Sequence, residues 1–230
     1  MEHAVYIQIE TDFQQHLENL RQAVRQPSVS ADGTGVEEMA LWLRDKIAAL
    51  GAQCHLARTD GYPIVYGYLD AGARNTVLFY DLYDVQPVQE GDWVAPPFSA
   101  DIVDFDGAGP CLIGRGSFNS KGCIMGFLNT LESFIRCGES IPVNILFMIE
   151  GEEEIGSPHL PDFIRAHLDE LRKADCVFWP YFGESRTGVT TVKLGSKGLV
   201  YIELICEGGD WGGPAVRDIH PKHAGWIASP

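Results

Sequence analysis

The feature that most constrains the fold of this 230-residue chain is an apolar run that ends in a group of glutamates. Residues 143–149, VNILFMI, are apolar at nearly every position, which is typical of a strand covered on both faces of a parallel sheet. Glu150, Glu152, Glu153 and Glu154 follow it directly. In open α/β sheets the ligand crevice lies beyond the carboxyl ends of the strands, so we expect these acidic side chains at a ligand site.

Two interpretations of the glutamates are open. Short runs of charged residues most often form a solvated face. At the end of a covered strand, however, closely spaced carboxylates repel each other and raise each other's pKa, and a bound cation would relieve that repulsion. A carboxylate with a raised pKa is also a useful general base, so the location favours metal-assisted hydrolysis as the first hypothesis.

Composition excludes several classes of partner and compartment. The formal net charge of -15 argues against nucleic acid or an anionic membrane as a partner, because the phosphates would be repelled. The six cysteines are scattered without a C-x-x-C pair, which indicates reduced thiols. The first residues lack the basic region of a signal peptide, and no apolar run approaches the roughly 20 residues of a membrane span. The sequence therefore predicts a cytoplasmic protein.

Hydrophobic periodicity and turn residues predict strands that alternate with helices. This alternation indicates an α/β fold with a mixed, mostly parallel sheet and helices on both faces. Helices are predicted at residues 11–26, between Thr34 and Gly51, at 121–136, and at 158–173 with Ser157 as N-cap and Pro158 at the first helical position. Strands are predicted at residues 54–57, 63–69, 76–80, 102–103, 143–149 and 175–179, and two more at 192–194 and 199–206 without a helix between them.

Several segments, in order along the chain, resemble the M20 family of metal-dependent exopeptidases and amidohydrolases. This family includes dipeptidases, carboxypeptidases, and acetylornithine and succinyl-diaminopimelate deacylases. The segments are LFYDLYDVQP (78–87), W..PPF (93–98), GRGSFNSKG (114–122), IEGEEEIGS (149–157) and RDIH (217–220). The resemblance implies a two-metal hydrolase with a zinc-exopeptidase-like α/β domain and an inserted α+β lid domain.

The resemblance also implies roles for individual residues. Glu153 matches the general base, and Glu154 matches the metal ligand that follows it. Asp84 matches the aspartate that steadies the first metal-binding histidine. His220 matches the lid histidine that, in the family's dimers, reaches the partner subunit's active site and stabilises the oxyanion.

The departures from the family pattern fall on the metal ligands. Leu82 replaces the histidine ligand, and an alkyl side chain cannot coordinate a cation. Asn119 replaces the bridging aspartate and offers only an amide oxygen, while Pro180 and Tyr181 occupy the region of a later carboxylate ligand. The remaining metal positions, Glu154 and Asn119, predict a degenerate ligand set that binds zinc weakly or not at all. A looser oxygen-rich site for magnesium, manganese or calcium stays open as an alternative.

We therefore expect a catalytic domain over residues 1–195 and the beginning of a lid or dimerisation domain, incomplete in this chain, over residues 196–230. The predicted function is hydrolysis of a peptide or of an N-acyl amino acid, with a homodimer through the lid. Two alternatives remain: a non-catalytic pseudoenzyme or binding scaffold, and an inactive fragment of a longer M20 peptidase.

Overall fold

A computed structural model describes residues 2–105, 107–181 and scattered positions between 191 and 204. The chain divides into the compact units Met1–Gly183 and Glu184–Pro230, of which the second lies almost entirely outside the described residues. His220 and most of the strand predicted at Leu199–Cys206 lie there as well. The domain boundary near residue 195 and the lid assignment therefore stay predictions.

The first unit contains both helices and strands, as the periodicity predicts, but they alternate only in its second half, because three helices and then five strands come first. Its helices are α1 (Glu2–Thr11), α2 (Phe13–Arg25), α3 (Val36–Ala49), α4 (Lys121–Arg136), α5 (Leu160–Ala166) and α6 (Leu168–Leu171). Its strands are β1 (Gln53–Ala57), β2 (Ile64–Leu69), β3 (Thr76–Leu82), β4 (Asp101–Phe105), β5 (Gly109–Ile113), β6 (Asn144–Glu150) and β7 (Cys176–Phe178). Two short 3₁₀ helices, η1 (Glu90–Asp92) and η2 (Glu153–Ile155), lie in the loops.

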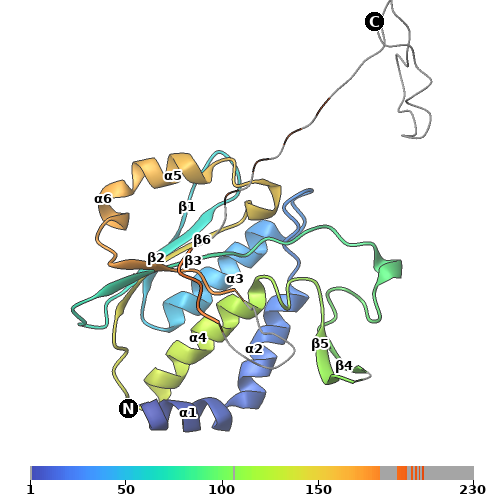
Figure 1. Cartoon of the computed structure of the whole chain (residues 1–230), viewed down its shortest axis with the longest axis horizontal. Helices are drawn as coiled ribbons and strands as arrows, with labels where there is room; N and C mark the ends of the chain where they lie inside the picture. The colour runs from blue at the N-terminus through green and yellow to red at the C-terminus, as the bar shows by residue number, and fades with distance from the viewer. Residues whose placement is uncertain are drawn as a thin grey trace, which may run out of the picture. The chain divides into compact units, whose positions relative to one another are not determined.

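The main sheet has the strand order β1-β2-β6-β3-β7, and β4 and β5 form a separate antiparallel hairpin. β6 pairs in parallel with β3, which pairs in parallel with β7, whereas β1, β2 and β6 are joined by antiparallel pairing. The predicted mixed α/β sheet is confirmed. Figure 1 shows α1 to α4 on one face of the sheet and α5 and α6 on the other.

The apolar run at residues 143–149 forms β6, the central strand of this sheet. Every residue of β6 is buried, because helices or neighbouring strands cover both of its faces. Phe79 of β3 stacks on Phe127 of α4, with ring centroids 4.1 Å apart, on the face that α3 and α4 cover. Met148 of β6 packs with Phe163 of α5 on the other face. Burial on both sides explains why the run is continuously apolar rather than alternating.

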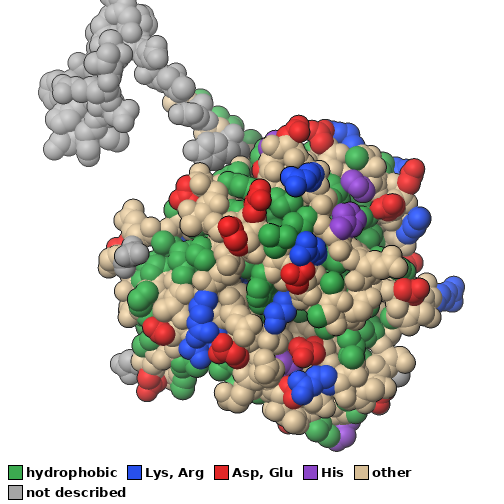
Figure 2. Space-filling view, turned by 180° about the vertical axis from the view of Figure 1, so that it is seen from behind, with side chains coloured by type: hydrophobic (Ala, Val, Ile, Leu, Met, Phe, Trp, Pro, Cys, Tyr) green, Lys and Arg blue, Asp and Glu red, His purple; other side chains and the backbone are tan. Residues whose placement is uncertain are grey.

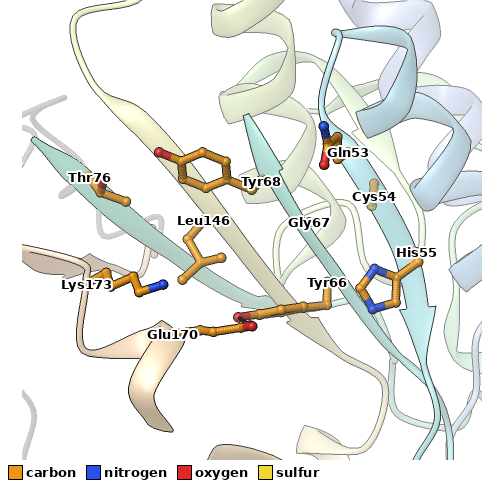
Figure 3. Close-up of a pocket in the computed structure, with 10 residues that line it drawn as sticks. All are labelled: Gln53, Cys54, His55, Tyr66, Gly67, Tyr68, Thr76, Leu146, Glu170 and Lys173. Carbon is orange, nitrogen blue, oxygen red and sulfur yellow. Dashed lines mark hydrogen bonds between the residues drawn. The ribbon is translucent and has the colours of Figure 1, made fainter. Parts of the chain in front are cut away.

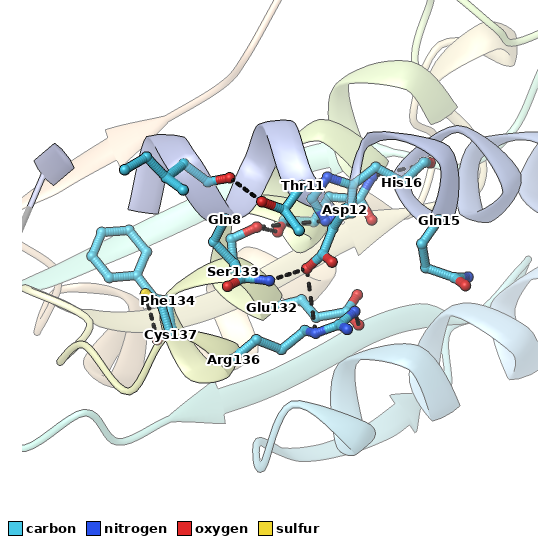
Figure 4. Close-up of polar contacts among 12 residues, drawn as sticks. Gln8, Thr11, Asp12, Gln15, His16, Glu132, Ser133, Phe134, Arg136 and Cys137 are labelled. Atoms are coloured by element: carbon cyan, nitrogen blue, oxygen red, sulfur yellow. Dashed lines mark hydrogen bonds and ion pairs between the residues drawn. The ribbon is translucent and has the colours of Figure 1, made fainter. Parts of the chain in front are cut away.

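Buried polar side chains join α1 and α2 to α4. The Asn19 amide donates to the Asn129 side-chain oxygen at 2.9 Å. Asp12 accepts a hydrogen bond from Gln8 at 2.6 Å and pairs with Arg136 at 3.3 Å (Figure 4). Because buried polar groups are costly without partners, these contacts favour one arrangement of the three helices.

The structure corrects three expectations about secondary structure. α1 was not predicted, because Val5 is its one buried apolar residue among those described and it shows no clear stripe. β5 lies within a glycine-rich stretch that gave no strand signal. The single helix predicted at 158–173 is instead two short helices, α5 and α6, which meet at His167; α5 begins at Leu160, and the Ser157 hydroxyl donates to Glu150 and does not cap it.

The surface of the described part carries both signs of charge. Figure 2 shows acidic and basic side chains interspersed among apolar ones on one face, so the net negative charge does not form a single patch there. No helix among the described residues has the length and apolar character that crossing a bilayer requires. The cytoplasmic location stays a prediction.

Asn144 provides a test of how the β2–β3 turn is held. Its side-chain oxygen accepts from the Ala71 and Ala73 amides at 3.0 and 3.1 Å, and its amide donates to the Ala73 carbonyl at 2.9 Å. Asn144→Ala should lower the free energy of unfolding by about 1–3 kcal/mol, because the partly buried backbone groups of Ala71 and Ala73 lose their partners. Urea unfolding measures this loss, and Asn75→Ala, at an exposed position in the same turn, is the control. Equal stability of the two variants would contradict the assignment.

Candidate functional site at the ends of β3 and β6

The acidic segments after β3 and β6 leave the sheet at the same edge. Parallel pairing places Leu82 opposite Glu150 at the carboxyl ends of both strands. The pairing continues one step further, since the Tyr83 amide donates to the Glu150 carbonyl at 2.8 Å. The next residue, Asp84, therefore lies beside the loop that carries Glu153, as the sequence predicts for a strand-end site.

Asp84 holds the acidic loop through its backbone. The carboxylate is fully buried and accepts hydrogen bonds from the Glu153 amide at 3.2 Å and the Glu154 amide at 3.0 Å. Burial raises the pKa of Asp84, and these hydrogen bonds oppose the shift. The structure thus gives Asp84 a direct contact with the loop, in addition to the role that the family resemblance implies.

Steric contact with Tyr83 explains why position 151, within the acidic motif, is a glycine. A Cβ at Gly151 would lie 2.4 Å from the ring and the hydroxyl of Tyr83. Tyr83 itself is fixed, because its hydroxyl donates to the Pro63 carbonyl at 2.6 Å. No larger residue fits at position 151 unless Tyr83 moves, so the turn from strand to acidic loop depends on this contact.

Glu150 is a buried carboxyl with two hydroxyl partners. The Tyr80 hydroxyl donates to it at 2.5 Å and the Ser157 hydroxyl at 3.0 Å. Burial raises the pKa of Glu150 to about 7, and the two hydrogen bonds oppose this shift. The residue therefore changes its protonation near neutral pH rather than in acid.

Glu153 and Glu154 are half-buried beyond the strand end. Burial raises the pKa of Glu153, and the nearby charges of Glu154 and Asp84 raise it further. The charge of Glu153 in turn raises the pKa of Asp81, so these carboxylates lie near one another. Glu154 accepts a hydrogen bond from the Gln86 amide at 2.9 Å. The group therefore concentrates negative charge at the ends of β3 and β6.

Two buried ionisable residues at this edge, Asp81 and Lys121, were not predicted from the sequence as site residues. Asp81 is fully buried, and burial raises its pKa to about 8; an acidic residue inside the apolar strand 76–82 was the available signal. Lys121 begins α4, and its ammonium donates to the Gln26 carbonyl. Burial lowers the pKa of Lys121 to about 7. No sequence pattern distinguished this lysine from a surface one.

The positions that match family ligands lie at the same edge. Leu82 is 1% exposed, and its carbonyl accepts a hydrogen bond from the Ser120 hydroxyl, which follows the half-buried Asn119. Trp179 follows β7, and its ring contacts the Tyr80 ring edge-on with centroids 5.3 Å apart. Residues 179–181 therefore approach the strand ends but bring no carboxylate to them.

The described residues contain no group of three or more His, Cys, Asp or Glu side chains that could hold a metal ion. The glutamates of the motif have separate partners, because Glu150 contacts Tyr80 while Glu154 contacts Gln86. His220 lies outside the described part of the chain, so its predicted place at the site stays a prediction.

A hollow lies on a face of the main sheet. It measures about 700 Å³ and is bordered by His55, Tyr66, Tyr68, Glu170 and Lys173, among others (Figure 3). It extends along the sheet from Thr76 at the start of β3 to Tyr66 of β2. None of the acidic residues at the strand ends lines it.

The raised pKa of Glu150 makes stability depend on pH. The folded state holds this proton more tightly than the unfolded state, where the carboxyl titrates near 4.5. The free energy of unfolding should therefore fall by about 1–3 kcal/mol as the pH rises from about 4.5 to about 7. Urea unfolding at pH 5 and pH 8 measures this. Glu150→Gln should show a smaller dependence than the wild type, while the buried Asp81, whose pKa is raised to about 8, still contributes in the same direction. The exposed Glu38→Gln should keep the full dependence. An unchanged pH dependence in Glu150→Gln would contradict the assignment.

Known proteins resemble this chain over most of its length. The model of peptidase family M20/M25/M40 matches residues 79–216. The Cys-Gly metallodipeptidase dug1 of Schizosaccharomyces pombe is 36% identical over 211 residues, which cover 82% of this chain and 42% of the relative. The Beta-Ala-His dipeptidase of Mus musculus is 32% identical over 72% of this chain and 33% of its own length.

Solved structures agree with the fold. A metallo-carboxypeptidase of the M20 family from Sulfolobus solfataricus superposes with a TM-score of 0.69 at 36% identity, over 75% of this chain and 38% of that one. Human carnosine dipeptidase 1 superposes with a TM-score of 0.71 at 26% identity, over 79% of this chain and 41% of that one. The chain thus spans about two fifths of the length of such relatives. From the matched segments and the shared fold, the chain belongs to peptidase family M20/M25/M40.

Proposed function

We propose that the strand-end site takes part in hydrolysing an amide bond of a small peptide or an N-acyl amino acid, with Glu153 as the general base. Two kinds of relative support this substrate class by their names, the Cys-Gly metallodipeptidase and the Beta-Ala-His dipeptidase. Both names describe dipeptide hydrolysis, and the present chain shares the segment that contains the base position.

The single observation that carries the proposal is the setting of Glu153. Its carboxylate stays partly accessible, while its backbone amide is fixed on the buried Asp84. Burial and the adjacent charges raise its pKa, which makes it a stronger acceptor for a proton from water. A base that is both fixed and partly exposed suits attack by water on a bound amide.

We infer that the metal-ligand set is degenerate. In the family a bound zinc pair would supply a polarised carbonyl and an activated water. The side chains present do not fit such a centre, because Leu82 is alkyl and Asn119 is a neutral amide. Glu154 and Asn119 are the ligand positions that remain, and they support at most a weakly held divalent cation.

The rest of the proposed machinery lies outside the described residues. His220 would donate a hydrogen bond to the oxyanion of the tetrahedral intermediate, in a homodimer formed through the lid. This role rests on the match of RDIH to the family pattern alone.

The second candidate is a non-catalytic binding scaffold, or an inactive part of a longer peptidase. The observation that favours it is the buried alkyl side chain of Leu82 at the ligand position. The scaffold would keep the acidic loop and its supports without a centre that activates water.

Glu153→Gln tests the base. The variant keeps the size of the side chain but cannot accept the proton, so hydrolysis of a dipeptide panel should fall by at least about 100-fold. For the wild type, kcat/KM should decline in acid with an apparent pKa above 4.5, the ordinary value for a glutamate, because the base must be ionised. The exposed Glu38→Gln serves as control. If Glu153→Gln still hydrolyses the dipeptides at the wild-type rate, Glu153 is not the base. If the wild type hydrolyses no dipeptide even with added zinc or manganese, the non-catalytic scaffold is favoured.

Restoring family ligands tests the degenerate set. Leu82→His combined with Asn119→Asp should bind zinc at least about 10-fold more tightly than the wild type, because an imidazole and a carboxylate replace an alkyl group and an amide. Competition with a chelator measures the affinity, and Leu82→Ile, which stays alkyl, is the control. Equally tight binding by the wild type would show that the ligand set is intact.

A further inference from the structure

Glu152 differs from the other glutamates of the motif in its surroundings. It is 5% exposed, and both oxygens of its carboxylate are engaged. The Tyr62 amide donates to one oxygen at 3.2 Å, and the His159 Nδ1 lies 3.1 and 2.9 Å from the two. The carboxylate thereby connects the acidic loop to the β1–β2 loop and to the residue before α5.

Gly61 leaves the room that this arrangement needs. A Cβ at this position would lie 1.9 Å from the Glu152 carboxylate and 2.5 Å from His159 Nδ1. The carboxylate and the imidazole therefore pack against a bare Cα. The β1–β2 loop is itself ordered, since the Thr59 hydroxyl donates to the Tyr62 carbonyl at 2.8 Å and the Tyr62 hydroxyl donates to the Ser30 carbonyl at 3.1 Å.

The backbone of Glu152 is fixed as well as its side chain. Its carbonyl accepts hydrogen bonds from the Ile155 amide at 3.1 Å and the Ser157 amide at 2.8 Å. Glu153 and Glu154 lie in the chain between Glu152 and Ile155, and their own amides donate to Asp84. The short helix η2 is therefore held from two directions, by Asp84 after β3 and, through Glu152, by the Tyr62 amide of the β1–β2 loop.

We infer that Glu152, His159 and Gly61 form a pin, here named the Glu152 pin, that sets the orientation of the Glu153 carboxylate. Its members are positioning residues, neither metal ligands nor bases. A buried carboxylate is costly without hydrogen bonds, so the loop cannot turn Glu152 out of its contacts without leaving the Tyr62 amide and His159 unpaired. An effect of the pin on catalysis rests on the proposed role of Glu153 as the base. The contacts that form the pin do not depend on that role.

Gly61→Ala tests the pin without altering any of the groups that bond. In the full 230-residue chain, the added methyl group should displace the Glu152 carboxylate, and hydrogen exchange at the Glu153 and Glu154 amides should speed up at least about 10-fold. Gly91→Ala is the matched control, because nothing lies within 4 Å of a Cβ there. Exchange in the core strand β6 reports any global loss of stability.

Two milder variants cover the case in which Gly61→Ala does not fold. Glu152→Gln keeps an acceptor for the Tyr62 amide but removes the charge, and His159→Gln removes the imidazole. Each should speed exchange at Glu153 and Glu154 more than exchange in β6. If exchange speeds up by the same factor at Glu153 and Glu154 as in β6, the three residues stabilise the whole fold and do not position the loop, which would overturn the proposal. Unchanged exchange at Glu153 and Glu154 in these variants would overturn it as well.

Kinetic measurements then distinguish a failure of the positioning role of the pin from a failure of the proposed function. If the wild type hydrolyses a dipeptide, the pin variants should lower kcat with less than a 3-fold change in KM, because the orientation of the base changes and binding does not. An increase in KM alone would overturn the positioning role. If the wild type hydrolyses no peptide, the proposed base fails, and the exchange experiment still decides whether the pin exists.

Discussion

The structure at the strand ends depends on one buried carboxylate, Asp84, which accepts the amides of Glu153 and Glu154. Parallel pairing of β3 with β6 brings the two chain segments to the same edge, but pairing ends at Glu150. Beyond that point the loop would be free to take many conformations. The two hydrogen bonds to Asp84, together with the contacts of Glu152, constrain the loop in place of the sheet. A negatively charged acceptor makes the bonds to Asp84 stronger than ordinary backbone hydrogen bonds.

In the described part of the chain, most carboxyl groups at the same edge contact neutral groups rather than cations. Asp84 and Glu154 accept hydrogen bonds from amides, and Glu150 accepts them from hydroxyls, whereas Glu152 has His159 as its partner. Burial and mutual repulsion therefore raise the pKa values of Asp84, Glu150 and Glu153. Such a site is prepared to bind or release protons near neutral pH.

The sheet and the acidic edge could be predicted because their signals are local and strong. A continuous apolar run identifies β6, and the family resemblance places Asp84 and Glu153 together. The contacts that finish the site join residues that are distant in the sequence. Nothing in the chain around residue 61 indicates that a glycine there accommodates Glu152, and the hydroxyl of Ser157 serves Glu150 although its position before a proline suggested a helix cap.

Lys121 gives the protein a built-in reporter. Its amine is buried against the Gln26 carbonyl, and its lowered pKa leaves much of it uncharged, hence nucleophilic, at neutral pH. Reagents that acylate amines cannot reach it while α4 and the segment after α2 stay packed together. The rate at which such a reagent modifies Lys121 therefore measures how often that junction separates, a motion that no static contact reveals.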